Sequence, residues 1–461
     1  MLVTLLAFVV ALSVLVAVHE WGHYRVAVAC GVKVLRFSIG FGRELWRFKP
    51  RRQHPGQDTE FVFAAIPFGG YVKMLDEREG AVAPEERHRA FNTQSLRARA
   101  AVVAAGPIAN LVLAALLYAV VSMVGMEEPR AVIAPPLAGS LAEKAGLRAG
   151  DEVLAAQRVG GEEVPLLSFE TLRWQLTRAG IDGQDVTLRY ARGGQSGDVR
   201  EARLPLSALP SREPDVAMLR AIGLLGPLRA PLIGEVLPGS AAERAGLRDG
   251  DVVRRAGKVE ITDGAQLREW IRASGSGGVK PRAETWVVER AGRELLLEVQ
   301  LDVVPDESGS GSIGRLGAAV GAPPQMVLVR RGPLASLWHG AQRVQEMSWL
   351  TLRLIGRMVT GQLSVRNLSG PITIADYAGR AARLGAVYFL NLLAYISVSL
   401  GVLNLLPVPV LDGGHLMYYL WEALTGKPVS SQWLQRLQYA GLSLLLAMMA
   451  VAMFNDISAR L

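Results

Sequence analysis

The chain has 461 residues, a formal net charge of +8 and a positive mean hydropathy of +0.24, with 50% hydrophobic residues. The length is too great for one ordinary soluble domain, and the hydropathy is high for a soluble protein. The positive charge does not indicate nucleic-acid binding, because it is concentrated in a loop between two apolar segments. The single cysteine, Cys30, excludes an internal disulfide.

Four apolar segments are each about long enough to cross a bilayer, whose hydrocarbon core of about 30 Å needs about 20 helical residues. The first segment could instead be a cleaved signal peptide. Against this, no Lys or Arg precedes its apolar run and no small-residue cleavage site follows it. We predict a polytopic α-helical membrane protein with four transmembrane helices, which lie within residues 1–25, 101–126, 385–424 and 425–461.

The first span ends in a cluster of ionisable residues. His19 and His23 are four residues apart, so on a helix both imidazoles face one side and can bind one metal ion. Glu20 follows the first of them and can act as general base towards water that a zinc ion activates. Ionisable groups at membrane depth are costly and mark functional sites. This favours a zinc site over two histidines that merely end a helix.

The first loop, residues 26–100, is predicted to be cytoplasmic and rich in β-structure. From Arg25 to Arg99 there are fourteen Lys and Arg against eight Asp and Glu, an excess that is typical of cytoplasmic loops. Residues 34–48 and 59–75 alternate and are rich in aromatic and β-branched side chains, as strands are. We predict a membrane-associated β-sheet with an edge strand open for pairing. An ordinary cytoplasmic hairpin is the alternative.

The segment between the second and third spans contains an internal repeat. AGSLAEKAGLRAGDEVLA (138–155) matches PGSAAERAGLRDGDVVRR (238–255) at a period of 100 residues. In each copy a small residue caps a short helix, and Gly-Asp then leads into a strand. Both copies resemble the core of a PDZ domain, which binds a peptide as an added strand. We predict two tandem extracytoplasmic PDZ domains (α+β) over residues 127–220 and 221–305. A peptide groove of the second copy is expected at Ile222, Gly223 and Leu224, with a closed or unused groove as the alternative.

Residues 306–384 are predicted to hold a linker and an amphipathic helix. The stretch PDESGSGSIGRLG (305–317) has the composition of a flexible linker. Residues 336–359 are apolar at helical spacing and have a polar face. We expect this helix to lie on the membrane surface.

A catalytic zinc ion bound by two histidines needs a third protein ligand. The stretch GVLNLLPVPVLDGGHLMYYL (401–420) holds Asn404, Asp412 and His415 in apolar sequence that two prolines interrupt. Asp412 is the favoured ligand and would leave a fourth position for water. His415 competes with it, but we expect His415 to lie behind the ligands. Asn404 can donate a hydrogen bond to substrate or to a developing oxyanion.

These residues carry a family resemblance. The motif at residues 19–23 and the stretch NLLPVPVLDGG (404–414) resemble the two signature motifs of the site-2 protease family of intramembrane zinc proteases. The stretches FSIGFGRELW, IPFGGYVKMLDER, AAGPIANLVLA and NLSGPITIA extend the resemblance over nearly the full chain. One departure is Ser399, where an asparagine is expected. The resemblance implies a Zn2+ site with Glu20 as general base, Asn404 close to substrate, and the metal ligands His19, His23 and Asp412.

The resemblance also implies the substrates and the location. Substrates are single-span membrane proteins already trimmed by another protease, including an anti-sigma factor of the envelope-stress response, and remnant signal peptides. The PDZ pair is expected to exclude untrimmed proteins by size. We expect a monomer in a bacterial inner membrane, with both termini and the PDZ domains in the periplasm and the active site near the cytoplasmic side. Substrate is expected to bind in extended form at the edge-strand residues Gly40, Phe41, Gly42, Gly69, Gly70 and Tyr71.

Two other functions are weaker interpretations of the same sequence. A non-catalytic PDZ-bearing membrane scaffold with a structural metal would hold the ion with four protein ligands. A metal transporter would be expected to carry ionisable groups in more spans and to contain a second membrane repeat, which is not seen in the sequence.

Overall fold

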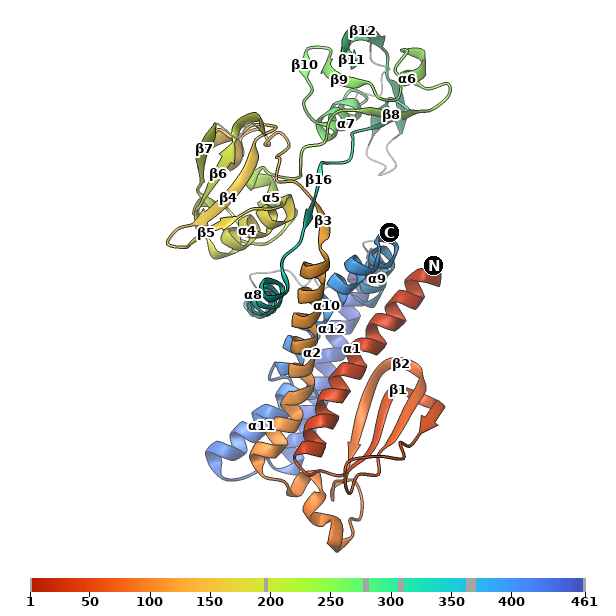
Figure 1. Ribbon diagram of the computed structural model, residues 1–461, viewed down its shortest axis with the longest axis vertical. Helices are drawn as coiled ribbons and strands as arrows, with labels where there is room; N and C mark the ends of the chain where they lie inside the picture. The colour runs from red at the N-terminus through yellow and green to blue at the C-terminus, as the bar shows by residue number, and fades with distance from the viewer. Residues whose placement is uncertain (1, 195–197, 277–281, 306–310, 362–369, 459–461) are drawn as a thin grey trace. The chain divides into compact units, whose positions relative to one another are not determined.

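The computed structural model describes residues 2–194, 198–276, 282–305, 311–361 and 370–458 (Figure 1). The chain divides into two compact units. The first unit consists of Met1–Met126 together with Arg330–Leu461 and is mainly helical. The second unit, Glu127–Val329, consists of small β-sheets flanked by helices.

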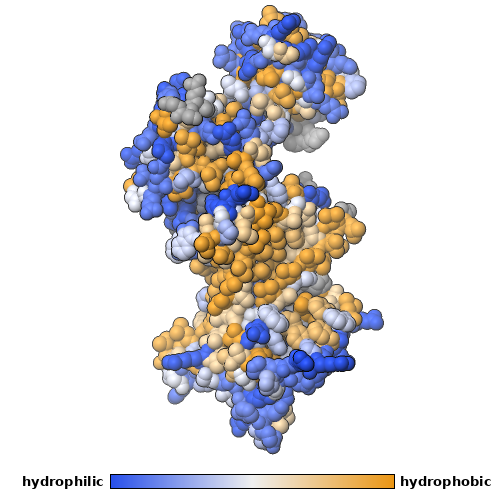
Figure 2. Space-filling model, in the orientation of Figure 1, coloured by the Kyte–Doolittle hydropathy of each residue, from blue (hydrophilic) through white to orange (hydrophobic). Residues whose placement is uncertain are grey.

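The first unit contains the candidate membrane spans. Four helices of the described chain are long and apolar enough to cross a membrane, which agrees with the prediction. Among them, α2 packs against both α1 and α10 (Figure 1). Figure 2 shows a band of apolar side chains over this helical unit, as expected for a surface in contact with lipid. The four helices are α1 (Leu2–Ala29), α2 (Leu96–Val124), α10 (Ala386–Leu405) and α12 (Ser431–Ser458).

The predicted third span, residues 385–424, is divided into two helices. α10 ends at Leu405, and α11 (Asp412–Thr425) begins after a non-helical connection. Pro407 and Pro409 lie in this connection, and proline lacks the N–H that would continue the helix. Val410 adopts a positive φ of 106°, which is rare for a β-branched residue. The break makes Asp412 the first residue of α11.

The predicted β-sheet is formed by two long bent strands, β1 (Val34–Phe48) and β2 (Glu60–Met74). The first half of β1 has partners on both sides. Ser38, for example, pairs with Tyr71 and with Val62. Residues 70–74 are therefore an edge of the sheet, and β2 packs against α1 (Figure 1).

Further helices complete the first unit. α8 (Pro333–Val359) covers the predicted amphipathic segment and packs against α2, where Gly340 lies against the backbone of Ala115 and Ala119. The stretch NLSGPITIA lies partly outside the described residues, which resume at Gly370 just before α9. The remaining elements of this unit are η1 (Pro84–Arg89), η2 (Phe91–Thr93) and α9 (Pro371–Leu384).

The first domain of the second unit is built on a four-stranded sheet of order β5-β4-β6-β7. Its core includes the fully buried Phe169 and Leu172 from α4 and Leu188 from β6. A two-stranded pair of β3 (Met126–Pro129) and β16 (Met326–Val329) joins the start and end of the insert. The elements of this domain are α3 (Leu141–Lys144), β4 (Glu152–Arg158), β5 (Glu163–Pro165), α4 (Phe169–Asp182), β6 (Val186–Ala191), η3 (Arg192–Gly194), β7 (Val199–Leu204), η4 (Leu206–Ala208) and α5 (Val216–Ile222).

The second domain has an equivalent four-stranded sheet of order β10-β9-β11-β12 around the buried Trp286. Two smaller pairs, β13 with β14 and β15 with β8, complete it. Its elements are β8 (Ile233–Val236), α6 (Ala241–Arg244), β9 (Val252–Ala256), β10 (Val259–Glu260), α7 (Gly264–Ala273), β11 (Glu284–Arg290), β12 (Arg293–Val299), β13 (Asp302–Pro305), β14 (Ser312–Arg315) and β15 (Ala318–Val320).

Both boundaries predicted for the second domain differ from the structure. Residues after 220 still belong to the first domain, since the N–H of Leu228 donates to the carbonyl of Val132. The predicted linker after 305 instead contributes β14 and β15, which pair with β13 and β8. The reason is that the last strand of each domain must return to pair with the segment that opens it, so each domain ends later than the repeat suggests.

The sequence repeat corresponds to a repeated set of contacts. Ser140 and Ser240 each accept the N–H of a glutamate three residues later, and that glutamate accepts the N–H of Gly139 or Gly239. This arrangement resembles a capping box, but the glutamate accepts from the residue before the N-cap. The following aspartates are buried and ion-paired: Asp151 with Arg192 at 3.0 Å and Asp251 with Arg290 at 2.6 Å.

Candidate metal centre

Three side chains from two helices meet inside the first unit. The Oδ2 of Asp412 on α11 lies 3.1 Å from the Nε2 of His19 and 3.5 Å from the Nε2 of His23, both on α1. The two Nε2 atoms are 3.1 Å apart. In the described chain, this is the one group of three or more His, Cys, Asp or Glu residues with ligand atoms close enough to hold a metal ion.

The spacing and the chemistry of these donors fit a zinc ion. In a tetrahedral site with bonds of about 2.0–2.1 Å, neighbouring ligand atoms lie about 3.3–3.4 Å apart. The three observed separations, 3.1, 3.1 and 3.5 Å, are close to this value. Two imidazole nitrogens with one carboxylate oxygen form a ligand set of the catalytic type, which keeps a fourth position open.

Helix α2 lies directly behind the two histidines. The Nδ1 of His23 donates to the carbonyl of Val102 at 2.8 Å, and the Nδ1 of His19 lies 3.2 Å from the amide of Asn110. Between them, Gly106 leaves room for both rings. The three α2 residues are each four apart and therefore share one helix face. None of these residues is among those predicted from the sequence, although an asparagine in an apolar span is a signal that can indicate a functional role.

Glu20 lies between the histidines in sequence and faces the sheet. A Cβ built on Gly70 of β2 would be 2.9 Å from the Cγ of Glu20 and 2.9 Å from Val16. The edge formed by residues 70–74 thus runs along α1 beside the carboxylate. Ile39 pairs with Gly70 on the other side of this strand.

The other predicted substrate-binding residues lie at the bend of the two strands. Gly40, Gly42 and Gly69 all have positive φ, which favours glycine. The rings of Phe41 and Tyr71 stack with centroids 6.1 Å apart. The bend is therefore a defined structure next to the edge strand.

Three further residues of the signature region are not part of the ligand group. His415 is on α11 with its ring 5.9 Å from that of Tyr418, and it is outside the ligand group. Asn404 is half-buried in the last turn of α10. Ser399, where the resemblance predicts asparagine, is half-buried and donates to the carbonyl of Tyr395 at 3.2 Å.

The groove residues predicted for the second PDZ copy belong to the first domain instead. Ile222 and Leu224 are buried in its core. The carbonyl of Gly223 accepts the N–H of Leu137 at 3.2 Å, and a Cβ on Gly223 would be 2.0 Å from the Oγ of Ser140. The assignment was wrong because the loop closes the domain that precedes it.

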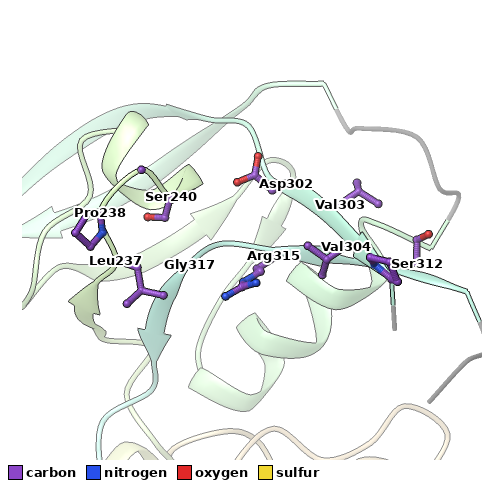
Figure 3. Close-up of a pocket in the computed structure, with 11 residues that line it drawn as sticks. Leu237, Pro238, Ser240, Asp302, Val303, Val304, Ser312, Arg315 and Gly317 are labelled. Atoms are coloured by element: carbon purple, nitrogen blue, oxygen red, sulfur yellow. The ribbon is translucent and has the colours of Figure 1, made fainter. Parts of the chain in front are cut away.

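Gly317 has the corresponding place in the second domain. Its carbonyl accepts the N–H of Leu237 at 2.9 Å, and a Cβ on it would be 2.4 Å from the Cβ of Ser240. Figure 3 shows these residues at one side of a hollow of about 770 Å³. The next strand, β15, borders a second groove of about 420 Å³ whose other wall includes Ile271 and Arg272 of α7.

Comparison with known proteins finds a family and relatives that match nearly the full length of the chain. The profile of Peptidase family M50 matches residues 7–448. The chain is 44% identical over 470 residues to a protein of Ralstonia nicotianae with the provisional name zinc metalloprotease, covering 99% of this chain and 98% of the relative. It is 39% identical over 471 residues to the regulator of sigma-E protease RseP of Escherichia coli, covering 98% of each. It is 38% identical over 475 residues to the protease RseP of Yersinia pestis, covering 99% and 98%.

Proposed function

The chain belongs to peptidase family M50, the site-2 proteases, and from this we propose that it is a zinc-dependent intramembrane protease of single-span proteins that another protease has already trimmed. The observation that carries the proposal is the convergence of His19, His23 and Asp412 within one ligand-sized space. Helices α1 and α11 are far apart in sequence, yet their donor atoms lie at the separations that one bound metal ion needs.

Five residues of the chain have roles in the proposed mechanism. His19, His23 and Asp412 would hold the zinc ion, which when bound supplies Lewis-acid activation of water at neutral pH. Glu20 takes the proton from the attacking water and then delivers it to the leaving amide nitrogen, as a general base and acid. Asn404 donates a hydrogen bond to the substrate near the site.

The substrate must be extended at the cleaved bond, because a helix uses its own amide groups in internal hydrogen bonds. We assign its binding to the edge of β2 at residues 70–74, beside Glu20. Strand addition to a sheet edge satisfies the backbone groups of an extended peptide. The bend residues Gly40, Phe41, Gly42, Gly69, Gly70 and Tyr71 end this edge and orient it.

We further propose that the two insert domains are PDZ domains that act as a size filter. The groove between β15 and α7, with the loop at Gly317, supports a strand-addition surface in the second domain. The excess of Lys and Arg in the first loop supports a cytoplasmic location for that loop. In the inner membrane, this orientation places both domains and both termini in the periplasm and the active site near the cytoplasmic side.

The substrates that we propose are the trimmed anti-sigma factor of the envelope-stress response and remnant signal peptides. The relatives named regulator of sigma-E protease support the first of these. The test uses the full chain, purified in detergent, with a single-span substrate lacking its periplasmic domain. Zinc content and cleavage are measured for the wild type, Glu20→Gln and Asp412→Ala.

We expect Glu20→Gln to retain zinc and lose cleavage, because the amide cannot accept a proton. Asp412→Ala should lose both zinc and cleavage. The exposed Glu79, changed to Gln, is the matched control and should behave as the wild type. Normal cleavage by Glu20→Gln would refute its role, and zinc retained by an active Asp412→Ala would refute the third ligand.

A further inference from the structure

The two histidines of the metal centre present the same edge to α2. The Nε2 atoms of His19 and His23 face Asp412, while the Nδ1 atoms face Asn110 and Val102. Metal-binding histidines generally donate their second ring N–H to a carboxylate, a carbonyl or water, which fixes the tautomer and the ring orientation. For His23, the carbonyl of Val102 at 2.8 Å supplies this acceptor.

The group that faces the Nδ1 of His19 is the side-chain amide of Asn110. This side chain is fully buried. Its Nδ2 lies 3.2 Å from the Nδ1 of His19, whereas its Oδ1 has no hydrogen-bond partner in the described structure. A buried polar atom without a partner costs about 1–3 kcal/mol. An imidazole that binds a metal through Nε2 carries its proton on Nδ1, so it needs an acceptor at this place, and Nδ2 cannot be one.

A half-turn of the amide exchanges Oδ1 and Nδ2, so that Oδ1 accepts the Nδ1–H of His19 and Nδ2 takes the place that Oδ1 leaves. We propose that Asn110 is a positioning residue whose Oδ1 accepts the Nδ1–H of His19 and thereby directs Nε2 at the metal. The backbone of Asn110 is itself held, because its carbonyl accepts the hydroxyl of Ser397 on α10 at 2.7 Å. This inference rests on the proposed zinc site.

The test compares two variants in the full chain that keep four side-chain heavy atoms and the branch at Cγ. Asn110→Leu keeps the branched shape and removes the acceptor. Asn110→Asp keeps an acceptor and forms a carboxylate–histidine–metal arrangement. Asn391→Leu on α10 is the matched control, since it makes the same chemical change away from the ligands. Zinc affinity is measured by competition with a chelator, and the visible spectrum of the cobalt-substituted protein reports the ligand geometry.

We expect zinc binding to weaken 10- to 100-fold in Asn110→Leu and to stay within a few-fold of wild type in Asn110→Asp. Equal affinity in Asn110→Leu and the wild type would overturn the inference. So would loss of zinc by Asn110→Asp, because the amide would then act as a donor through Nδ2.

Thermal unfolding in excess chelator separates positioning from packing. If Asn110 positions His19, the metal-free forms of the wild type and Asn110→Leu should melt at the same temperature. A metal-free variant that melts well below the metal-free wild type would assign the residue to packing. A wild-type protein that binds no zinc would defeat the proposed function itself, which is a different result from any of these.

Discussion

Gly106 of α2 lies so close to His23 that a Cβ built on it would be 2.3 Å from the Nε2 of the imidazole. The same Cβ would be 2.8 Å from the Nε2 of His19. Real Cβ contacts are not this short, so the absence of a side chain at residue 106 is what lets α2 approach the two ligands. A glycine of α1 also permits the close approach of the two helices, since a Cβ on Gly22 would be 2.4 Å from the carbonyl oxygen of Ala105.

We expect Gly106→Ala to weaken zinc binding, although alanine favours a helix more than glycine does. The added methyl group must displace both ligand nitrogens, which should lower zinc affinity on the order of 10- to 100-fold, as loss of a ligand's support does. Zinc content after equilibration with a chelator is the measurement. Gly356→Ala, in an open part of α8, makes the same change and should leave zinc content unaltered. Full zinc affinity in Gly106→Ala would contradict the tight approach of the helices.

The two halves of the metal centre could be predicted from the sequence, but the residues of α2 that support them could not. Two histidines at helical spacing and an aspartate after two prolines are local patterns, and each can be interpreted without a partner. The role of α2 depends on which face of that helix meets α1. Apolar residues surround Asn110 on all sides in the sequence, so no periodicity indicates that face. Only the packed structure shows that Val102, Gly106 and Asn110 lie behind the ligands.

The insert was predictable in kind and not in extent. The capping serines and buried aspartates are local signals, and they recur in both copies. The strand that closes each domain pairs with residues far from it in sequence, as β15 does with β8. Such non-local pairing cannot be predicted from a short segment of the sequence. That is why the loop at Gly223 was assigned to the wrong copy.

Gly70 supports a prediction about substrate binding. A Cβ there would be 2.7 Å from the carbonyl oxygen of Ser38 and 2.9 Å from Glu20 and Val16. Gly70→Ala should push the edge strand away from α1 and misplace both the strand and the general base. A shift of about 1 Å can cost on the order of 100-fold in rate, so kcat/KM for a trimmed substrate should fall by about 10- to 100-fold.

Zinc content distinguishes this effect from damage to the metal site. It should be normal in Gly70→Ala, because the three atoms nearest to a Cβ on residue 70 belong to Ser38, Glu20 and Val16 and to none of the ligands. The control is Gly80→Ala, where a Cβ meets nothing within 4 Å. Unchanged kcat/KM in Gly70→Ala would show that the edge of β2 does not have to lie against Glu20.

The buried ion pair of the second domain predicts a pH dependence. Burial raises the pKa of the Asp251 carboxyl, but hydrogen bonds from the Arg290 guanidinium and the N–H of Arg248 outweigh burial and hold that pKa below its usual value. Because the folded-state pKa is below the unfolded value of about 3.9, the ionised pair stabilises the fold fully above that value. This contribution is lost as the pH falls through the folded-state pKa.

Hydrogen exchange of the full chain, with peptides from β9 and β11, measures this contribution. At pH 7, Asp251→Asn should lower the free energy of opening of these strands by about 1.5–3 kcal/mol, the range for a hydrogen bond to a charged group. From pH 7 to pH 3, the difference should stay constant down to about pH 5 and shrink below about pH 4, as the wild type loses protection and approaches the variant. Asp249→Asn, at an exposed site in the same turn, should follow the wild type. A constant difference between the wild type and Asp251→Asn across this range would contradict the assigned pKa direction.

Asp456 near the end of α12 supplies the N-terminal cap that α9 lacks. The helix begins after Gly370, which has no side chain to accept its free N–H groups. The Asp456 carboxylate instead accepts the N–H groups of Gly370, Ile372 and Thr373 at 2.9, 2.9 and 3.1 Å, together with the hydroxyl of Thr373 at 2.6 Å.

A cap of this kind contributes about 0.5–2 kcal/mol to a helix. We expect Asp456→Ala to speed amide exchange in the first turn of α9 by about 10-fold, since about 1.4 kcal/mol corresponds to that factor. Asn455→Ala is the neighbouring control, and equal exchange in the two variants would mean that α9 does not depend on this carboxylate.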